Sequence, residues 1–153
     1  TRPGVGVRVD LLYVAHNRLR FTQETFPALL ANTNWELVEK LHVLDDDSTD
    51  GTAGFLLAEV TEFYDRQDMT IDCVSQKFGG PVAAMNHAIK RCETDTLVKV
   101  DSDLLLCPGW LDALLTVLWA NPRVDILGFE AGFGDQCEAY GAGLFFDAAA
   151  VRA

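Results

Sequence analysis

The sequence has few cysteines, no long apolar run and little positive charge, and each shortage excludes a class of protein. The four cysteines include no C-x-x-C pair, so neither a zinc-binding knuckle nor the disulfide framework of a small secreted domain is indicated. We expect reduced thiols, most of them in the core. No apolar run approaches the roughly 18 residues that a membrane-spanning helix needs. Asp10 also interrupts the N-terminal apolar stretch that a signal peptide would require, so we expect a cytoplasmic protein without a membrane span.

The charge of the chain is strongly negative. Acidic side chains outnumber basic ones by 23 to 12, which gives a formal net charge of −11. Such a chain repels phosphate backbones and anionic membrane surfaces unless a metal ion or a local basic cluster intervenes. Nucleic acid is therefore not expected as a partner.

The size and composition are those of one ordinary globular domain. The chain has 153 residues, of which 49% are hydrophobic and 23% are charged. This length is sufficient to bury a substantial core, and no internal repeat, low-complexity tract or linker divides it. We expect residues 1–153 to form a single unit.

Segments typical of strands and helices alternate, which predicts an α/β fold with a mainly parallel sheet. The runs expected to form strands are residues 7–14, 37–44, 69–74, 96–101, 124–129 and 144–146. The segments with helical spacing are residues 22–32, 52–64, 81–89 and 108–120. Thr22 is expected to cap the first helix, and Pro108 is expected to begin the last.

The strand at residues 96–101 delivers two carboxylates, Asp101 and Asp103, to its C-terminal end. Ligands of open α/β sheets bind outside the carboxyl ends of the strands, so this pair is expected to face a ligand crevice. Carboxylate oxygens suit Mg²⁺ or Mn²⁺, which proteins hold together with substrate phosphates. The alternative is a pair of solvated turn aspartates.

A second acidic loop, residues 45–52, follows the strand at residues 37–44. Its spacing excludes a calcium-binding EF-hand. Counted from Asp46, the twelfth position is Leu57, where a bidentate glutamate is required. Asp50 or Thr52 is expected to cap the helix that follows.

Two glycines, Gly79 and Gly80, precede Pro81 at the start of the helix expected over residues 81–89. Glycines at a helix N-terminus let a ligand approach the backbone amides closely, and Lys77 stands nearby. The other glycine pair, Gly4 and Gly6, precedes a strand. A dinucleotide fingerprint needs its glycines after the strand, so a Rossmann cofactor site is excluded.

Taken together, these motifs carry a family resemblance. They are, in chain order, Asn17-Arg18, Asp45-Asp46-x-Ser48-Thr49-Asp50-Gly51-Thr52, Gly79-Gly80 with Asn86, and Asp101-Ser102-Asp103. From about residue 7 to residue 128 the sequence resembles the nucleotide-sugar-binding part of family 2 glycosyltransferases with the GT-A fold. The resemblance implies a three-layer α/β sandwich. It also implies metal-dependent, inverting transfer from a nucleoside diphosphate sugar, in particular a UDP-sugar, to an unidentified saccharide, lipid or protein acceptor.

The resemblance also implies roles for single residues. His16 would lie against the nucleobase, and Asp46, with Asp45 beside it, would accept the imide N–H of the base. Asp101 would hold the ribose or the water shell of the metal, and Asp103 would bind Mn²⁺ or Mg²⁺ directly. The remaining residues expected at the nucleotide sugar are Asn17, Arg18, Gly79, Gly80 and Asn86.

Each of these roles has a plain structural alternative. The alternative for His16 is a loop histidine without a function, and Asn86 is equally consistent with a solvent-facing residue. Asp50 is better explained as a helix cap than as a ligand contact. Lys77 and Lys99 are better explained as solvated or core-edge lysines than as ligands of phosphate.

The acceptor side is where the resemblance ends. Inverting relatives use a carboxylate as general base in an acceptor-binding half, and we expect that half to be short or missing here, because residues 141–146 resemble the strand that leads into it. Asp135 and Glu138 are weak candidates for the base. The alternative function is a non-catalytic nucleotide-sugar-binding module, or a fragment that needs a partner for its acceptor site. A sugar nucleotidyltransferase is disfavoured, because the expected glycine-rich activation loop is missing.

Overall fold

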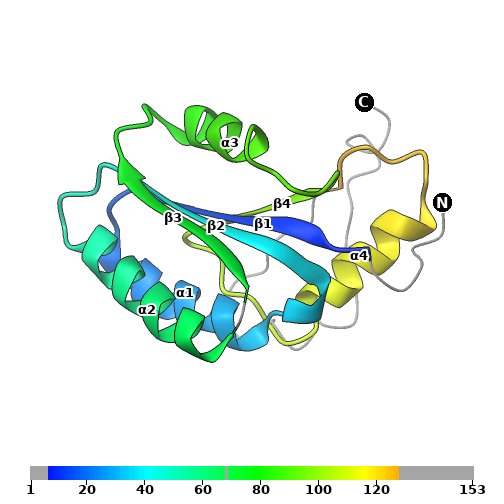
Figure 1. Ribbon diagram of the computed structural model, residues 1–153, viewed down its shortest axis with the longest axis horizontal. Helices are drawn as coiled ribbons and strands as arrows, with labels where there is room; N and C mark the ends of the chain where they lie inside the picture. Colours follow the sequence, from blue (N-terminus) through cyan, green and yellow to red (C-terminus); the bar gives the residue numbers. More distant parts are fainter. Residues whose placement is uncertain (1–6, 68, 128–153) are drawn as a thin grey trace.

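A computed structural model describes residues 7–67 and 69–127 of the chain and shows a three-layer α/β sandwich (Figure 1). Its elements, in order, are β1 (Val9–Ala15), α1 (Leu19–Asn32), the 3₁₀ turn η1 (Trp35–Leu37), β2 (Val38–Asp46), α2 (Thr52–Arg66), β3 (Thr70–Gln76), α3 (Pro81–Ile89), β4 (Leu97–Asp101) and α4 (Trp110–Ala120). The sheet has four strands in the order β3-β2-β1-β4. Every neighbouring pair is parallel, which confirms the predicted fold class.

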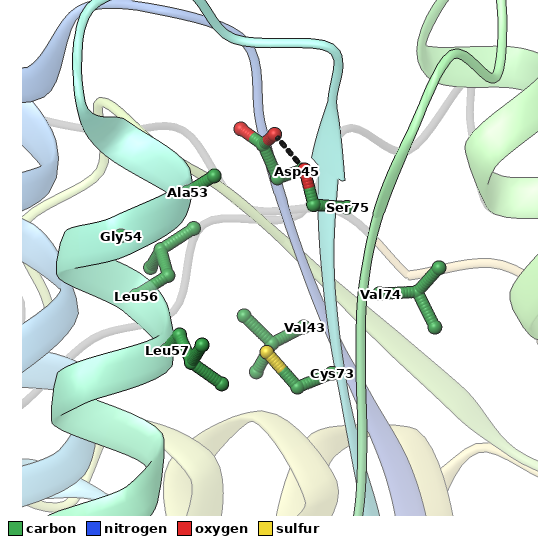
Figure 2. Close-up of a pocket in the computed structure, with 9 residues that line it drawn as sticks. All are labelled: Val43, Asp45, Ala53, Gly54, Leu56, Leu57, Cys73, Val74 and Ser75. Carbon is green, nitrogen blue, oxygen red and sulfur yellow. Dashed lines mark hydrogen bonds between the residues drawn. The ribbon is translucent and has the colours of Figure 1, made fainter.

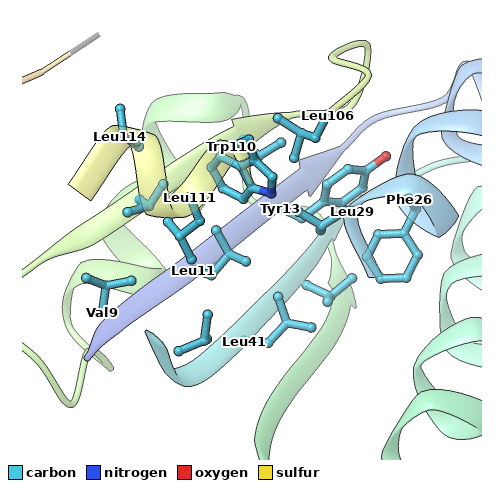
Figure 3. Close-up of a cluster of buried hydrophobic side chains, with 14 of the residues drawn as sticks. Val9, Leu11, Tyr13, Phe26, Leu29, Leu41, Leu106, Trp110, Leu111 and Leu114 are labelled. Carbon is cyan, nitrogen blue, oxygen red and sulfur yellow. The ribbon is translucent and has the colours of Figure 1, made fainter. Parts of the chain in front are cut away.

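Helices cover both faces of the sheet, with α3 on one side and α1 and α2 on the other (Figure 1). Leu11 and Tyr13 of β1 belong to the larger hydrophobic cluster, which also contains residues of α1, α2 and α4 (Figure 3). Leu12, between them, packs on the opposite face with Ala84 and Ala88 of α3. Burial on both faces explains why β1 reads as a nearly continuous apolar run.

The order of the strands places a crevice at the carboxyl end of β1. The chain passes from β1 to β2 and β3 on one side and then returns to β4 on the other side of β1. Open α/β sheets bind ligands where the strand order reverses in this way. The Asp-x-Asp at the end of β4 therefore lies beside the loop that follows β1.

Two predicted helix starts are wrong. Helix α1 begins at Leu19, and Thr22 is a buried residue inside it, because the distant Asp50 caps the helix by accepting the Leu19 N–H at 2.9 Å. Helix α4 begins at Trp110, because Gly109 takes a left-handed conformation with φ of 80° and leaves Pro108 in the preceding turn.

The strand predicted over residues 124–129 is not formed where the structure describes it. Residues 124–127 have no ladder partner among the described strands, since the sheet ends at β4 on that side. Residues 128–129, the loop at 135–143 and the strand predicted at 144–146 lie outside the described residues.

The expectation that most cysteines are core residues is wrong for the described ones. Cys73 is exposed because β3 is an edge strand, and Cys92 and Cys107 lie in half-buried turns. Cys73 and Cys92 are free thiols, as predicted. Cys137 lies outside the described residues. In the part of the chain that the structure describes, no helix has the length and apolar character needed to cross a membrane.

Candidate functional site

A cleft of about 640 Å³ opens at the carboxyl edge of the sheet. It brings together seven of the residues singled out from the sequence, contributed by the loops after β1, β2, β3 and β4: His16, Arg18, Asp46, Gly79, Gly80, Asp101 and Asp103. The other lining residues are Val14, Ala15, Asp47, Lys77, Pro81, Lys99 and Ser102. Motifs that are widely separated in the sequence thus meet in one place.

Asp46, the last residue of β2, holds the glycine loop that precedes α3. Its Oδ1 accepts the backbone N–H groups of Phe78 at 2.7 Å and Gly79 at 3.1 Å, and its Oδ2 accepts that of Gly80 at 2.8 Å. Burial raises the pKa of this carboxyl, but the three N–H groups and nearby His16 outweigh it and leave the pKa below its ordinary value. Gly79 and Gly80 have φ of 93° and 119°, conformations that disfavour any other residue.

His16 lies exposed at the mouth of the cleft, just after β1. Its Nδ1 bonds the main-chain carbonyl of Asp46, which can only accept, so Nδ1 carries the proton. Its Nε2 is then the acceptor for Asn17 Nδ2 at 3.4 Å. Both hydrogen bonds lie at the edge of the imidazole ring, so neither of them occupies its face.

Asn17 joins the loops after β1 and β2 rather than lining the cleft. Its backbone N–H donates to Ser48 Oγ at 2.7 Å, and its Oδ1 accepts the Thr49 N–H at 2.8 Å. Asp50 adds the bond to Leu19 described above and also accepts the Thr52 N–H at 3.1 Å. Asp50 thus accepts a first-turn N–H group of both α1 and α2, although the N-cap residue of α2 is Gly51, and it ties the same two loops together.

Asp45 and Asn86 lie away from the cleft. Asp45 is 3% exposed, and its Oδ2 accepts the Ser48 N–H at 3.2 Å and the Ser75 hydroxyl at 2.7 Å. It lines a separate cavity of about 220 Å³ between α2 and strands β2 and β3, whose other walls are Val43, Ala53, Gly54, Leu56, Leu57, Cys73, Val74 and Ser75 (Figure 2). Asn86 is exposed on α3 and does not line the cleft.

The Asp-x-Asp carboxylates are each paired with a cation. Lys99 Nζ donates to Asp101 Oδ1, and Arg18 Nη1 lies 3.6 Å from Asp103 Oδ2. Lys77 is exposed and Lys99 is half-buried, which agrees with the expected solvated or core-edge positions, and both also line the cleft. The missed signal was spacing, because Lys99 lies two residues before Asp101 and so shares its face of β4.

A buried hydrogen-bond chain supports the backbone between the two aspartates. Thr25 Oγ1 donates to the Ser102 carbonyl at 2.7 Å, so the Tyr13 hydroxyl must donate to Thr25 Oγ1, 3.0 Å away. Burial raises the pKa of Tyr13 despite its hydroxyl partners, which keeps it a donor. In the sequence, the signal for these hydrogen bonds was limited to the polar groups of Tyr13 and Thr25 among mainly apolar core positions.

The donor chemistry of Asp101 and Asp103 fits a divalent metal ion. Both carboxylates are exposed to the cleft, and hard oxygen ligands suit Mg²⁺ and Mn²⁺ equally. The fit rests on two carboxylates with open space in front of them, where a diphosphate would complete the coordination.

A second group of potential ligands lies under α3, far from the cleft along β1. Asp10, His42 and Cys92 each offer one atom, and these atoms lie within 4.8 Å of one another. A mixed oxygen, nitrogen and sulfur set suits zinc. The Asp10 oxygens already accept hydrogen bonds, however, from His42 Nε2 at 2.7 Å and from the Thr94 hydroxyl at 2.7 Å and backbone N–H at 2.9 Å. These bonds favour a metal-free polar network, which the sequence analysis did not predict.

Comparison with solved structures shows the same fold in proteins that are longer than this chain. S. aureus TarS (residues 1–349) in complex with UDP has a TM-score of 0.62 at 20% identity, over 85% of this chain and 39% of that one. Mannosyltransferase PcManGT from Pyrobaculum calidifontis, in complex with GDP-Man and Mn²⁺, has a TM-score of 0.59 at 23% identity, over 81% and 34%. The chain thus spans well under half of each protein.

Comparison of the sequence with family models identifies the family. A search of curated proteins found no match. The model of the family described as Glycosyl transferase family 2 matches residues 11–142, which is most of the chain and includes all four ordered motifs. The chain therefore belongs to glycosyl transferase family 2.

Proposed function

We propose that the cleft binds a nucleoside diphosphate sugar, in the first place a UDP-sugar, together with Mn²⁺ or Mg²⁺, and that the protein transfers the sugar with inversion to a saccharide, lipid or protein acceptor. The observation that carries the proposal is the convergence of His16, the Asp46-held glycine loop and the Asp-x-Asp in one cleft. The structures of TarS with UDP and of PcManGT with GDP-Man and Mn²⁺ support this ligand class.

In this proposal the nucleobase of the bound nucleotide lies at the β1–β2 side of the cleft. His16 offers its ring face to the nucleobase, and Asp46 accepts the imide N–H with a lone pair that its three backbone donors leave free. Asn17 fixes the His16 loop, and Asp45 supports the loop after β2 from below. Asn86 lies outside the cleft and would reach the ligand only after a movement of α3.

The diphosphate lies at the other side of the cleft, between α3 and β4. Gly79 and Gly80 let it approach the N-terminus of α3, whose partial positive charge favours anions. Asp103 holds the metal and Asp101 the ribose or the water shell of the metal, while Arg18 contributes a further positive charge. When bound, the metal stabilises the negative charge that develops on the leaving diphosphate.

The weak candidates for the general base, Asp135 and Glu138, lie outside the residues that the structure describes. Replacing each with alanine tests them. Loss of transfer with retained UDP binding would identify the base, because a base acts on the acceptor hydroxyl rather than on the nucleotide.

The proposal is tested by calorimetric titration of UDP into the wild-type protein in Mn²⁺ and in EDTA, beside Asp103→Ala. We expect wild type to need the metal and Asp103→Ala to lose that dependence while keeping its melting temperature. Asp65→Ala, an exposed aspartate on α2, is the matched control. Equal binding of UDP by wild type in EDTA would overturn the role of Asp103.

A second experiment separates an enzyme from a binding module. UDP-sugar hydrolysis is followed across a panel of sugars with and without Mn²⁺. Metal-dependent turnover of one sugar supports the transferase, whereas tight binding without turnover supports the non-catalytic alternative.

A further inference from the structure

Lys99 occupies a position in the cleft that its sequence context did not suggest. It lies on β4 between the buried Val98 and Val100, and its side chain emerges on the face that carries Asp101. The side chain is 30% exposed, so most of its stem is covered while the ammonium group reaches the Asp101 carboxylate. The aliphatic part of the Lys99 side chain is thus packed against the protein, and its ammonium group faces the cleft.

The cleft is nearly balanced in charge although the chain carries a net charge of −11. Its cationic lining residues are Arg18, Lys77 and Lys99, and its carboxylates are Asp46, Asp47, Asp101 and Asp103. Asp46 is committed to three backbone N–H groups. Both carboxylates proposed for the metal are therefore neutralised by the protein's own cations in the ligand-free state.

A divalent cation cannot use Asp101 without competing with Lys99, because the ammonium group already bonds Asp101 Oδ1. Two positive charges at one carboxylate repel each other, and the compact ammonium group on its flexible stem is the one that can move. A bound diphosphate would offer the ammonium group a new anionic partner in the same cleft, because Lys99 lines it together with Gly79, Gly80 and Pro81 at the start of α3.

We propose that Lys99 exchanges partners on ligand binding: it pairs with Asp101 in the free protein and moves to the diphosphate when the metal ion, directly or through its water shell, engages Asp101. This inference rests on the proposed function and adds a positioning residue to it. The metal then does more than supply its own charge, since its arrival releases a second cation for the phosphates. Without metal, that cation stays neutralised by Asp101.

The exchange predicts effects of opposite sign from one substitution. Lys99→Met keeps the stem and removes the charge. Mn²⁺ alone should bind this variant more tightly than wild type, because its competitor is gone. UDP in saturating Mn²⁺ should bind about tenfold more weakly, which is the scale of losing a charge-assisted hydrogen bond. Uridine, which has no phosphates, should bind wild type and variant alike.

The test is calorimetric titration of Mn²⁺, of UDP in Mn²⁺ and of uridine in Mn²⁺ into wild type, Lys99→Met and Lys90→Met. Lys90 is an exposed lysine at the end of α3 that does not line the cleft, so Lys90→Met controls for the loss of one positive charge. Equal melting temperatures establish that the variants are folded. The expected result is tighter Mn²⁺ and weaker UDP binding for Lys99→Met only.

Other results overturn the exchange in distinguishable ways. If Lys99→Met tightens both Mn²⁺ and UDP, Lys99 is a fixed counterion of Asp101 that never reaches the phosphates. If it weakens uridine as much as UDP, its role is only structural. If wild type binds UDP and the variant matches it, the exchange alone is wrong. If wild type binds no UDP with any divalent ion, the proposed function fails as well.

Discussion

Asp46 and Gly80 lie 34 positions apart in sequence, yet Asp46 Oδ2 accepts the Gly80 backbone N–H at 2.8 Å. With the bonds to Phe78 and Gly79, a single carboxylate at the end of β2 shapes the whole loop that leads into α3. The two most recognisable motifs of the chain are therefore one structural unit. Replacing Asp46 should therefore alter the conformation of the glycine loop.

Asp46→Asn should lower the free energy of unfolding by about 1–3 kcal/mol, because an amide has one acceptor oxygen in place of two and leaves a part-buried backbone N–H group unpaired. It should also weaken UDP, by about 1.5–3 kcal/mol, more than it weakens ADP if Asp46 reads the base. Urea unfolding and calorimetry measure the two effects. Asp65→Asn, at an exposed aspartate on α2 that does not line the cleft, is the control.

The pH dependence of this contribution has a definite sign. The folded-state pKa of Asp46 lies below its ordinary value of 3.8, so the stabilisation is complete above that value and is lost as the pH falls through the folded pKa. The stability gap between wild type and Asp46→Asn should therefore narrow in acid. A gap that widens below pH 3.8 would contradict the assignment.

Gly54 and Gly51 should respond in opposite directions to the same substitution. Gly54 lies inside α2 and lines the cavity between α2 and β3 (Figure 2), and a Cβ there would meet nothing within 4 Å. Gly54→Ala should raise the free energy of unfolding by about 0.5–1 kcal/mol, because alanine favours the helix. Gly51→Ala should lower it, since Gly51 has φ of 91°. Thermal unfolding compares them, and destabilisation by Gly54→Ala would show that the cavity must stay open.

The buried Asp10–His42 pair should be worth more to stability than any exposed ion pair of the chain. Both side chains are fully buried, and removing one partner leaves the other without compensation. Asp10→Ala should therefore cost about 3–5 kcal/mol in urea unfolding near neutral pH. Burial raises the pKa of Asp10, but its bonds to His42, Thr94 and Glu93 outweigh that effect and lower it.

Two further measurements check the Asp10 assignment. Because the folded pKa is lowered, the cost of Asp10→Ala should shrink as the pH falls below 3.8. Because the Asp10 oxygens are already occupied, EDTA should leave the melting temperature of wild type unchanged. A fall in melting temperature with EDTA that zinc restores would instead assign Asp10, His42 and Cys92 to a metal site.

Hydrophobic periodicity was sufficient to predict most of the fold. The strand β1 and the helix α3 have continuous or regularly spaced apolar residues, and both form close to the expected positions. The start of α1 could not be predicted, because its cap is Asp50, from a different loop. The sequence around Thr22 suggested a local cap, but the helix starts earlier, where its first N–H group bonds Asp50, 31 positions away in sequence.

The candidate site was predictable as a set of motifs but not as individual contacts. Asp45 and Asp46 are adjacent, so their side chains leave β2 on opposite faces, and only Asp46 lines the cleft. Asp10 is the one charged residue of β1, and His42 lies between the apolar Leu41 and Val43 of β2. Their pairing depends on the register of β1 against β2. Such pairs follow from three-dimensional neighbours rather than from composition.

Thr25 links the core to the backbone of the Asp-x-Asp motif. Substituting it therefore tests whether this link holds the motif in place. It is 4% exposed, donates to the Ser102 carbonyl and accepts from the Tyr13 hydroxyl. Thr25→Val keeps the shape and removes both bonds. The buried Tyr13 hydroxyl then loses its bond to Thr25, so the free energy of unfolding should fall by about 1–3 kcal/mol.

The same substitution should weaken Mn²⁺ binding, because Ser102 loses the hydrogen bond that holds the backbone between Asp101 and Asp103. Thr61→Val is the control: Thr61 is exposed on α2, and its hydroxyl bonds only the Leu57 carbonyl at 2.7 Å among the contacts that the structure describes. Adding Tyr13→Phe to Thr25→Val should restore stability, since both partners of the buried bond are then gone, but should not restore Mn²⁺ affinity. If the double variant recovers both, Thr25 acts on the site only through stability, and the Ser102 bond has no separate effect on the metal.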